Sequence, residues 1–296
     1  MKARAPVTAS FLGDQLGPRG RRRVRAASVV SILAIVAILV VAANRLGDKG
    51  QFADNLWRPL RQWSVLNFLL SGLVLTLKAA AVAMVIAMAI GIVMALGRLA
   101  KNRPIRWVSG AYVEFFRAMP LILLILFCWL GLRQQGLDIS PFQALVLGLS
   151  VYNGAVLGEI FRAGVLSLDR GQSEAASALG LGYWQSMRAV ILPQAARRMA
   201  PAIVSQLVTL LKDTSLGYVI NVDDALRRAR DTGTFYGNHL QAFALMALCY
   251  ILINLALSRL ANYLEVRQQR RLGAQRIDVG GVEDLAVVGA QASVQA

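Results

Sequence analysis

Charged and hydroxyl side chains inside otherwise apolar stretches are the residues of this sequence that could do chemistry. Lys212, Asp213, Thr214 and Ser215 follow one another in such a stretch. Adjacent helical residues point about 100° apart, so the lysine and the aspartate cannot readily neutralise each other. Each must reach another helix, water or a bound molecule. The four residues are candidates for a substrate path through a membrane. The alternative, which the sequence favours at least as well, is that they form a buried polar network between helices.

Two further carboxylates each have an arginine three residues later. Glu114 precedes Arg117, and Glu159 precedes Arg162. On a helix each pair lies on one face, so its two charges can neutralise each other in a structural or interfacial role. Arg117 is also a candidate residue of the substrate path.

Residues for other chemistries are too few. His239 is the only histidine, which leaves a histidine-based metal site or catalytic triad without enough parts. No Gly-x-x-x-x-Gly-Lys-Ser/Thr stretch occurs, so ATP hydrolysis by this chain alone is not predicted. The scattered carboxylates, mostly near basic residues, argue against a membrane enzyme with converging groups. We expect no catalytic residue, and no metal or cofactor bound by this chain.

Long apolar runs must position these residues. The 296 residues are 56% hydrophobic and 16% charged, and a bilayer core needs roughly 20 apolar helical residues to cross it. If one run begins near Pro201, Lys212 lies about 16 Å along it, near mid-bilayer. Gly154 and Gly158 are spaced to let another helix approach closely. The sequence predicts an all-α integral membrane protein with about six transmembrane helices, within 26–43, 68–96, 108–132, 141–165, 201–220 and 240–264.

The basic residues indicate how these spans are oriented. The net charge is +16, and Lys and Arg collect in the cytoplasmic loops of membrane proteins. Four segments on one side, 1–25, 98–106, 162–198 and 259–276, hold 21 of the 32 basic residues, and the opposite segments hold 8. Both termini are therefore predicted to be cytoplasmic. Because the basic residues are shared among several loops without a recognition motif, nucleic acid is not a predicted partner.

The chain divides into four predicted parts. Residues 1–25 form a basic cytoplasmic segment, and 26–43 form an extra N-terminal transmembrane helix. A cleaved signal peptide is the alternative for this run, but the length of both parts favours an anchor. Residues 64–268 form the main transmembrane domain. Residues 269–296 mix Gly, Ala, Val, Gln and acids and are predicted to be a disordered cytoplasmic tail.

The loop between the fourth and fifth spans carries the most specific motif. Glu174-Ala175-Ala176 is followed after three residues by Gly180, and then by Val190-Ile191-Leu192-Pro193. A short helix over 172–179 can end at Gly180 in a left-handed conformation. A second helix can then run from Gly182 until Pro193 interrupts it. Two such helices could enter the cleft of a soluble partner, and an amphipathic loop packed on its own bundle is the alternative.

This pattern resembles the EAA loop of bacterial ABC importer permeases. Val190 stands where isoleucine is usual, an exchange that preserves packing. Segments 112–121, 159–164 and 211–216 are similar to those of polar amino-acid permeases and keep their order, so the resemblance covers roughly residues 70 to 270 and implies the type I importer permease fold. The coupling residues that it implies are Glu174, Ala175, Ala176, Gly180, Leu192 and Pro193.

The resemblance implies a multi-pass transmembrane subunit of an ATP-driven importer of polar amino acids in the bacterial plasma membrane. Its implied partners are an ATPase subunit dimer that uses ATP and Mg, a second permease subunit (the same or a related chain), an extracytoplasmic amino-acid-binding protein and membrane lipid. The extra N-terminal span resembles actinobacterial-style glutamate permeases, so glutamate or aspartate is the first expectation. Another polar amino acid is close behind. A proton-coupled carrier that uses Glu114, Glu159 and Asp213 is the alternative function.

Overall fold

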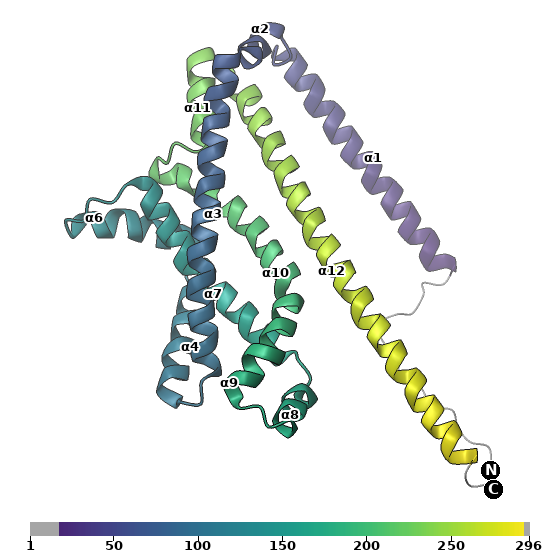
Figure 1. Cartoon of the computed structure of the whole chain (residues 1–296). Coiled ribbons are helices and arrows are strands. Elements are labelled where there is room, and N and C mark those ends of the chain that lie inside the picture. The colour runs from purple at the N-terminus through teal and green to yellow at the C-terminus, as the bar shows by residue number, and fades with distance from the viewer. Residues whose placement is uncertain (1–17, 293–296) are drawn as a thin grey trace. The chain divides into compact units, whose positions relative to one another are not determined.

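The computed structural model describes residues 18–292, which form helices joined by short turns and loops and contain no strand. The chain forms two compact units, residues 1–58 and residues 59–296, and both are drawn in Figure 1. Each unit is described by itself below.

The first unit consists mainly of α1, Pro18–Asp48, followed by the short α2, Asp54–Trp57. The part of α1 over Arg22–Asp48 is long and apolar enough to cross a membrane, and none of its most apolar window is buried within the chain. A helix that is apolar on all sides suits lipid. The predicted span 26–43 lies inside this helix. Residues 1–17 of the predicted basic segment lie outside the described residues.

Two long helices, α3 (Trp63–Leu99) and α7 (Pro141–Leu166), run side by side at the centre of the second unit (Figure 1). Their contact is close because glycines occupy it. A Cβ added at Gly154 would lie 2.6 Å from Ile90 Cγ2, and one added at Gly158 would lie 3.1 Å from Met94 Cβ. The predicted close helix approach at these two glycines is confirmed.

The predicted span over 108–132 is not one straight helix, because the chain bends by 102° between Ala118 and Leu121. α4 (Arg103–Ala118) ends before Met119, which is extended, and Pro120 precedes α5 (Leu121–Leu126). Proline has no N–H to continue a helix and disfavours the helical conformation of the residue before it. The chain then continues through a π-helical turn, Phe127–Gly131, into α6, Leu132–Gln134.

The remaining elements lead from the predicted coupling loop to the last long helix. α12 begins at His239, one residue before the last predicted span. It continues through Ala292, although the sequence predicted a disordered tail from residue 269. Residues 239–292 contain no proline to interrupt a helix. The other elements are α8 (Arg170–Ala178), α9 (Tyr183–Ser186), the π turn Met187–Ile191, α10 (Leu192–Asp213), the 3-10 helix η4 (Thr214–Ile220) and α11 (Ala225–Tyr236).

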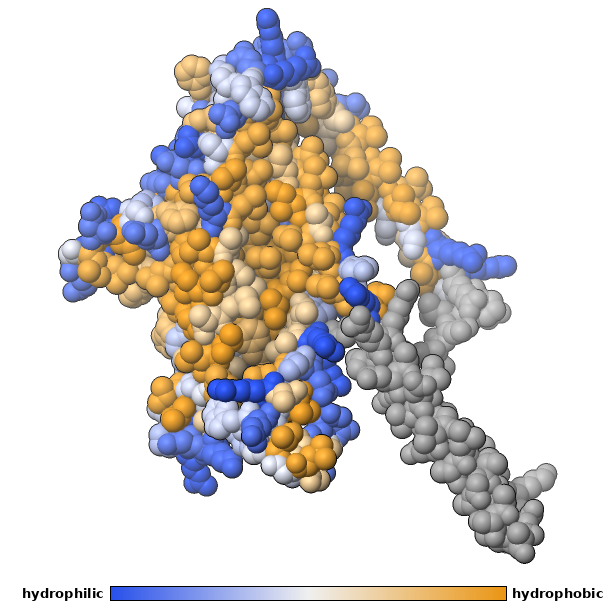
Figure 2. Space-filling view, in the orientation of Figure 1, coloured by the Kyte–Doolittle hydropathy of each residue, from blue (hydrophilic) through white to orange (hydrophobic). Residues whose placement is uncertain are grey.

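Four helices of the described residues are long and apolar enough to cross a membrane, or five if the bent pair α4 and α5–α6 counts as one span. α10 is not among them, because Gln194, Arg197, Arg198, Gln206 and Lys212 interrupt its apolar residues. A sixth crossing by α10 stays a prediction. In Figure 2 the second unit is apolar across its middle and hydrophilic toward its ends. The predicted class, an all-α membrane protein, is confirmed.

Candidate functional site

The first helix of the predicted coupling loop ends at Gly180. This residue has φ +76°, and its N–H donates to the Ser177 carbonyl at 3.0 Å. The N–H of Leu181 donates to the Ala176 carbonyl at 3.1 Å. These two bonds form a Schellman motif, whose left-handed residue favours glycine. The predicted short helix and its left-handed end are therefore present.

The second helix of the loop does not stop at Pro193, so the predicted interruption there is wrong. The Gly182 N–H donates to Gln185 Oε1 at 2.9 Å as this helix begins. The chain then stays helical from Tyr183 to Asp213, with a π turn at Met187–Ile191 just before the proline. The wider turn accommodates a residue that lacks an N–H and would clash with a carbonyl four residues earlier.

Hydrogen bonds hold this loop against the start of α10. Gln194 Nε2 donates to Gln172 Oε1 at 3.0 Å, and the Arg198 guanidinium donates to the Ser167 carbonyl at 2.6 Å. Ala176 is buried, whereas its neighbours Glu174 and Ala175 are exposed. Ile191 is buried as well, so the motif packs Ala176 and Ile191 inward and leaves Glu174, Ala175, Leu192 and Pro193 exposed.

Three large apolar side chains at the loop surface were not predicted from the sequence. Leu179, Tyr183 and Trp184 are 82%, 54% and 61% exposed, and the two rings meet edge to face at 5.4 Å between centroids. Exposed apolar patches are more frequent at binding surfaces than elsewhere on a protein. The aromatic pair directly after Gly182 was the signal that could have found it. The loop lies at the lower end of the second unit in Figures 1 and 2.

The four predicted path residues lie where α10 changes into η4, but they do not all face one way. The Thr214 hydroxyl donates to the Leu211 carbonyl, and the Ser215 hydroxyl donates to the Lys212 carbonyl, each at 2.7 Å. Thr214 is fully buried, Asp213 is half-buried, and Lys212 is exposed. Only Lys212 and Ser215 line the neighbouring pocket.

This pocket, of about 600 Å³, lies between the end of α10 and α12. Its walls are mostly apolar, and Tyr250 and Asn254 of α12 are among its lining residues. The Tyr250 side chain interacts with the buried hydroxyls of Thr76 and Thr214, whereas Asn254 Oδ1 is buried without a hydrogen-bond partner among the described residues. Because unpaired buried polar atoms are costly, Asn254 Oδ1 is suited to meet a polar ligand. These two residues were not predicted from the sequence.

A carboxylate beside this pocket was also missed. Asp224 accepts a hydrogen bond from the Arg227 N–H at 2.9 Å at the start of α11, and the next residue, Ala225, donates its N–H to the Thr76 hydroxyl at 3.2 Å. Burial raises the pKa of Asp224 to about 6, against the lowering effect of the backbone hydrogen bonds. Its charge therefore changes in the weakly acidic range.

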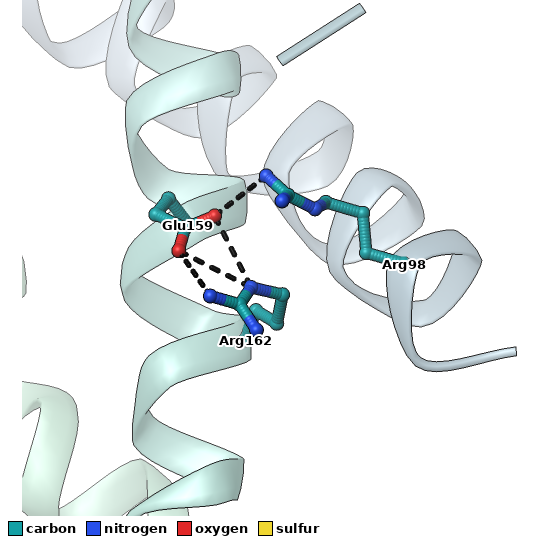
Figure 3. A network of polar contacts seen from close by, with 3 residues as sticks. All are labelled: Arg98, Glu159 and Arg162. Atoms are coloured by element: carbon teal, nitrogen blue, oxygen red, sulfur yellow. Dashed lines mark hydrogen bonds and ion pairs between the residues drawn. The ribbon is translucent and has the colours of Figure 1, made fainter. Parts of the chain in front are cut away.

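One of the two predicted Glu–Arg pairs is present, and a third residue joins it (Figure 3). Glu159 Oε1 accepts from Arg162 Nη2 at 2.6 Å within α7, and Glu159 Oε2 accepts from Arg98 Nη1 of α3 at 2.7 Å. Arg117 acts on this carboxylate only electrostatically. Arg98 follows α3's apolar run and was not predicted to take part.

The other predicted pair is not formed. Glu114 and Arg117 are both exposed on α4, and no ion pair of the described side chains includes either of them. Arg117 was predicted to belong to the path with Lys212, but it does not line the pocket that holds Lys212 and Ser215.

The fold and these two regions define a helical membrane component with a surface loop of short helices and a pocket between α10 and α12. Residues 87–270 match the family described as "Binding-protein-dependent transport system inner membrane component". The chain belongs to this family, and the resemblance inferred from its motifs is confirmed.

Curated relatives of this chain are amino-acid permeases. It is 37% identical over 240 residues to the glutamate transport system permease protein GluD of Corynebacterium glutamicum, covering 79% of this chain and 86% of that protein. It is 39% identical over 210 residues to the glutamate/aspartate import permease protein GltK of Escherichia coli O157:H7, covering 68% and 94%. It is 38% identical over 199 residues to the arginine transport system permease protein ArtQ of Bacillus subtilis, covering 67% and 91%.

Solved structures show the same fold. An amino acid ABC transporter crystallised with histidines superposes with a TM-score of 0.65 at 33% identity, covering 68% of this chain and 94% of that one. The MetNI methionine ABC transporter gives 0.54 at 21% identity, covering 69% and 99%, which shows the fold alone.

Proposed function

We propose that this chain is the transmembrane subunit of an ATP-driven importer that moves polar amino acids across the bacterial plasma membrane. Relatives with similar identity are described as glutamate, glutamate/aspartate and arginine permeases. These names support an amino acid as the substrate. The amino acids in these names differ in the charge of their side chains. The preference of this importer among amino acids must therefore come from residues of this chain and of its binding protein.

The pocket beside Lys212 carries the proposal for an acidic substrate. Lys212 is the charged residue among those that line it, and Asn254 adds an amide oxygen without a hydrogen-bond partner among the described residues. A lysine at the end of a helix inside the membrane attracts a carboxylate, because charged groups there need a partner. Glutamate and aspartate present two carboxylates to this site, and we propose them as the preferred substrates.

The coupling loop supports the proposed partners. α8 and α9 are held at a fixed angle by the Gly180 turn and expose Leu179, Tyr183 and Trp184. We propose that they dock into an ATPase subunit dimer, which binds ATP and Mg, while a second permease subunit completes the path and an extracytoplasmic binding protein delivers the amino acid. Glu174, Ala175, Ala176, Gly180, Leu192 and Pro193 form the proposed coupling residues. The positive charge of these loops supports our proposal that both termini lie on the ATPase side of the membrane.

Reconstituted transport tests this function. The complex with its ATPase and binding protein is placed in proteoliposomes, and uptake of labelled glutamate is measured with ATP, with and without a proton gradient. We expect ATP-dependent uptake that aspartate inhibits more strongly than glutamine or arginine. Lys212→Ala should lower uptake at least about tenfold, because it leaves the carboxylate of the substrate without its partner. Loss of such an interaction weakens binding by about 1.4 kcal/mol or more. Uptake that follows the proton gradient without ATP would contradict the proposal.

Gly180→Val tests the coupling loop separately. A Cβ at Gly180 meets no atom within 4 Å, so valine strains only the left-handed backbone, at roughly 1–2 kcal/mol. We expect the ATPase to remain bound while ATPase stimulation by loaded binding protein is lost. The matched control is Gly182→Val, because Gly182 has φ −65° and an added Cβ would meet only Gln185 Oε1, at an ordinary 3.5 Å. Equal stimulation in both variants would exclude a special role of the Gly180 turn.

A further inference from the structure

A basic turn joins α3 to α4 at the end of the second unit that also carries the coupling loop. Residues 98–106 contain four basic side chains and no acidic one; the basic ones are Arg98, Lys101, Arg103 and Arg106. Lys101 Nζ lies 5.8 Å from the centroid of the Tyr183 ring in the coupling loop. Figure 1 shows the start of α4 and α9 at the lower end of this unit. The turn therefore lies on the side of the membrane where we propose that the ATPase binds.

Three of these cations form no ion pair with the side chains that the structure describes. Lys101, Arg103 and Arg106 are all exposed, and none of them belongs to an ion pair of this part of the chain. Arg98 differs from them, because it binds Glu159 at 2.7 Å. Three positive charges at this turn are thus open to an anion from outside the chain.

The length of α3 places the turn at the level of lipid headgroups. The apolar run 68–96, whose only charged residue is Lys78, lies within α3 and is about 43 Å long as a helix. A bilayer with its headgroup regions is about 40–45 Å thick. Because the run matches this thickness, the residues that follow it, from Arg98 onward, lie among the headgroups.

Trp107 lies at the same level on α4. A Cβ added at Gly97 would lie 2.9 Å from Ser109 Cβ, so the end of α3 packs against the second turn of α4. Trp107 precedes Ser109 by two residues and therefore lies near the end of the apolar run. It is 75% exposed, and Ile105 and Val108 beside it are exposed as well. Tryptophan is enriched at the interface of membrane and water, so this part of α4 has the composition of an interfacial helix.

We propose that the turn between α3 and α4 binds an anionic phospholipid of the cytoplasmic leaflet. Arg103, Arg106 and Trp107 are three and four residues apart, so they share one side of α4. The guanidinium groups donate hydrogen bonds to the phosphate oxygens, for which their fork geometry is suited, and the acyl chains lie against Trp107. Clusters of about four or more basic residues at the cytoplasmic end of a span attract anionic lipids.

The apolar side chains among the cations favour a lipid over a free phosphate ion. A free ion would leave Ile105, Trp107 and Val108 in water, whereas a phospholipid covers them with its chains. The inference goes beyond the proposed transport and rests on it in assigning this turn to the cytoplasmic leaflet.

Quenching of tryptophan fluorescence by brominated lipids tests this site. The full chain is placed in phosphatidylcholine vesicles that contain the same small fraction of a brominated lipid, either phosphatidylglycerol or phosphatidylcholine. The difference between the chain and its Trp107→Phe variant isolates the signal of Trp107 from that of the other tryptophans. We expect Trp107 to prefer phosphatidylglycerol at least about tenfold, because each basic residue near the surface adds to the attraction of an anionic lipid.

Charge variants show whether the turn produces this preference, each variant being measured with and without Trp107. Arg103→Gln/Arg106→Gln should lower the preference at least about tenfold, whereas Arg103→Lys/Arg106→Lys, which keeps both charges, should retain most of it. The matched control is Arg133→Gln/Arg230→Gln, which removes two exposed arginines from segments on the predicted opposite side. An equal loss in this control, or no preference in the unchanged chain, would overturn the inference.

Two additions separate a lipid from other occupants. An excess of soluble glycerol phosphate, compared with chloride at the same ionic strength, should not displace phosphatidylglycerol, because it has no chains to lie against Trp107. Displacement would assign the site to a free phosphate. Binding of the ATPase subunit dimer should leave the preference intact, and its loss would assign the turn to the ATPase. Either of these results contradicts the lipid site.

The quenching requires no substrate, ATP or binding protein and is therefore independent of transport. A preference for phosphatidylglycerol in a chain whose complex takes up no amino acid would keep the lipid site and contradict the proposed function. ATP-dependent uptake without the preference would do the reverse.

Discussion

The α7 and α4 segments carry the same sequence feature, a glutamate followed three residues later by an arginine, and they use it differently. In α7, Glu159 forms an ion pair with Arg162 at 2.6 Å and a second one with Arg98 of α3 at 2.7 Å. In α4, Glu114 and Arg117 are exposed and form no ion pair with the described side chains. The spacing makes a pair possible in both helices. The element packed beside each helix decides whether the pair forms inside the subunit.

Close packing of α3 on α7 is what brings Arg98 to Glu159. Gly91 and Gly158 face each other so tightly that a Cβ at Gly91 would lie 3.1 Å from the Gly158 backbone nitrogen. Among the described residues, none packs on the charged face of α4 in this way, and Glu114 and Arg117 are exposed. The comparison therefore predicts that the α7 pair depends on the glycines between α3 and α7, and that the α4 pair does not.

Gly154→Val should have the largest effect on the subunit. The added Cβ would lie 2.6 Å from Ile90 Cγ2, so α3 must move away from α7 and the bond between Arg98 and Glu159 should break. Overpacking of a tight contact costs about 3 kcal/mol at the upper end of its usual range. The thermal unfolding temperature of the detergent-purified subunit measures it. Gly110→Val is the control, because a Cβ at Gly110 meets nothing within 4 Å; similar losses in both variants would refute the argument.

Glu159→Gln should have an intermediate effect. It leaves the guanidinium groups of Arg98 and Arg162 without their carboxylate, and hydrogen bonds to charged groups contribute about 2 kcal/mol. These side chains are 18–30% exposed, so water compensates in part. The same unfolding measurement should show a smaller loss than for Gly154→Val. Arg98→Gln, which removes one of the two partners, should cost less again; an equal or larger loss would mean that Arg162 is not the main partner.

The sequence was sufficient to predict the elements whose signals are local. Ser140 and Gln143 form reciprocal hydrogen bonds at the start of α7, which was predicted to begin at Pro141, and Gly180 ends α8 as a glycine in the left-handed region. The bend at Pro120 was missed because the apolar residues continue on both sides of it. Hydropathy indicates which residues can lie in lipid, whereas a proline interrupts the backbone hydrogen bonds of a helix. The hydropathy pattern alone therefore did not reveal the bend.

Contacts between segments that are distant in the chain could not be predicted from the sequence. Tyr250 and Asn254 lie 38 and 42 residues after Lys212 and join its pocket only because α12 packs against α10. Arg98 reaches Glu159 across 61 residues. A single sequence shows which residues could pair on one helix, but it does not show which helices become neighbours.

Glu114→Gln should have the smallest effect on the subunit and so gives the sharpest test of the comparison. If the α4 pair does not form within one subunit, removing its negative charge takes away no internal hydrogen bond, and substitutions away from such contacts usually change stability by less than about 0.5 kcal/mol. Unfolding of detergent-separated single subunits should therefore be unchanged, in contrast to Glu159→Gln. A loss of subunit stability equal to that of Glu159→Gln would show that Glu114 and Arg117 pair internally. The two helices would then use the same spacing in the same way.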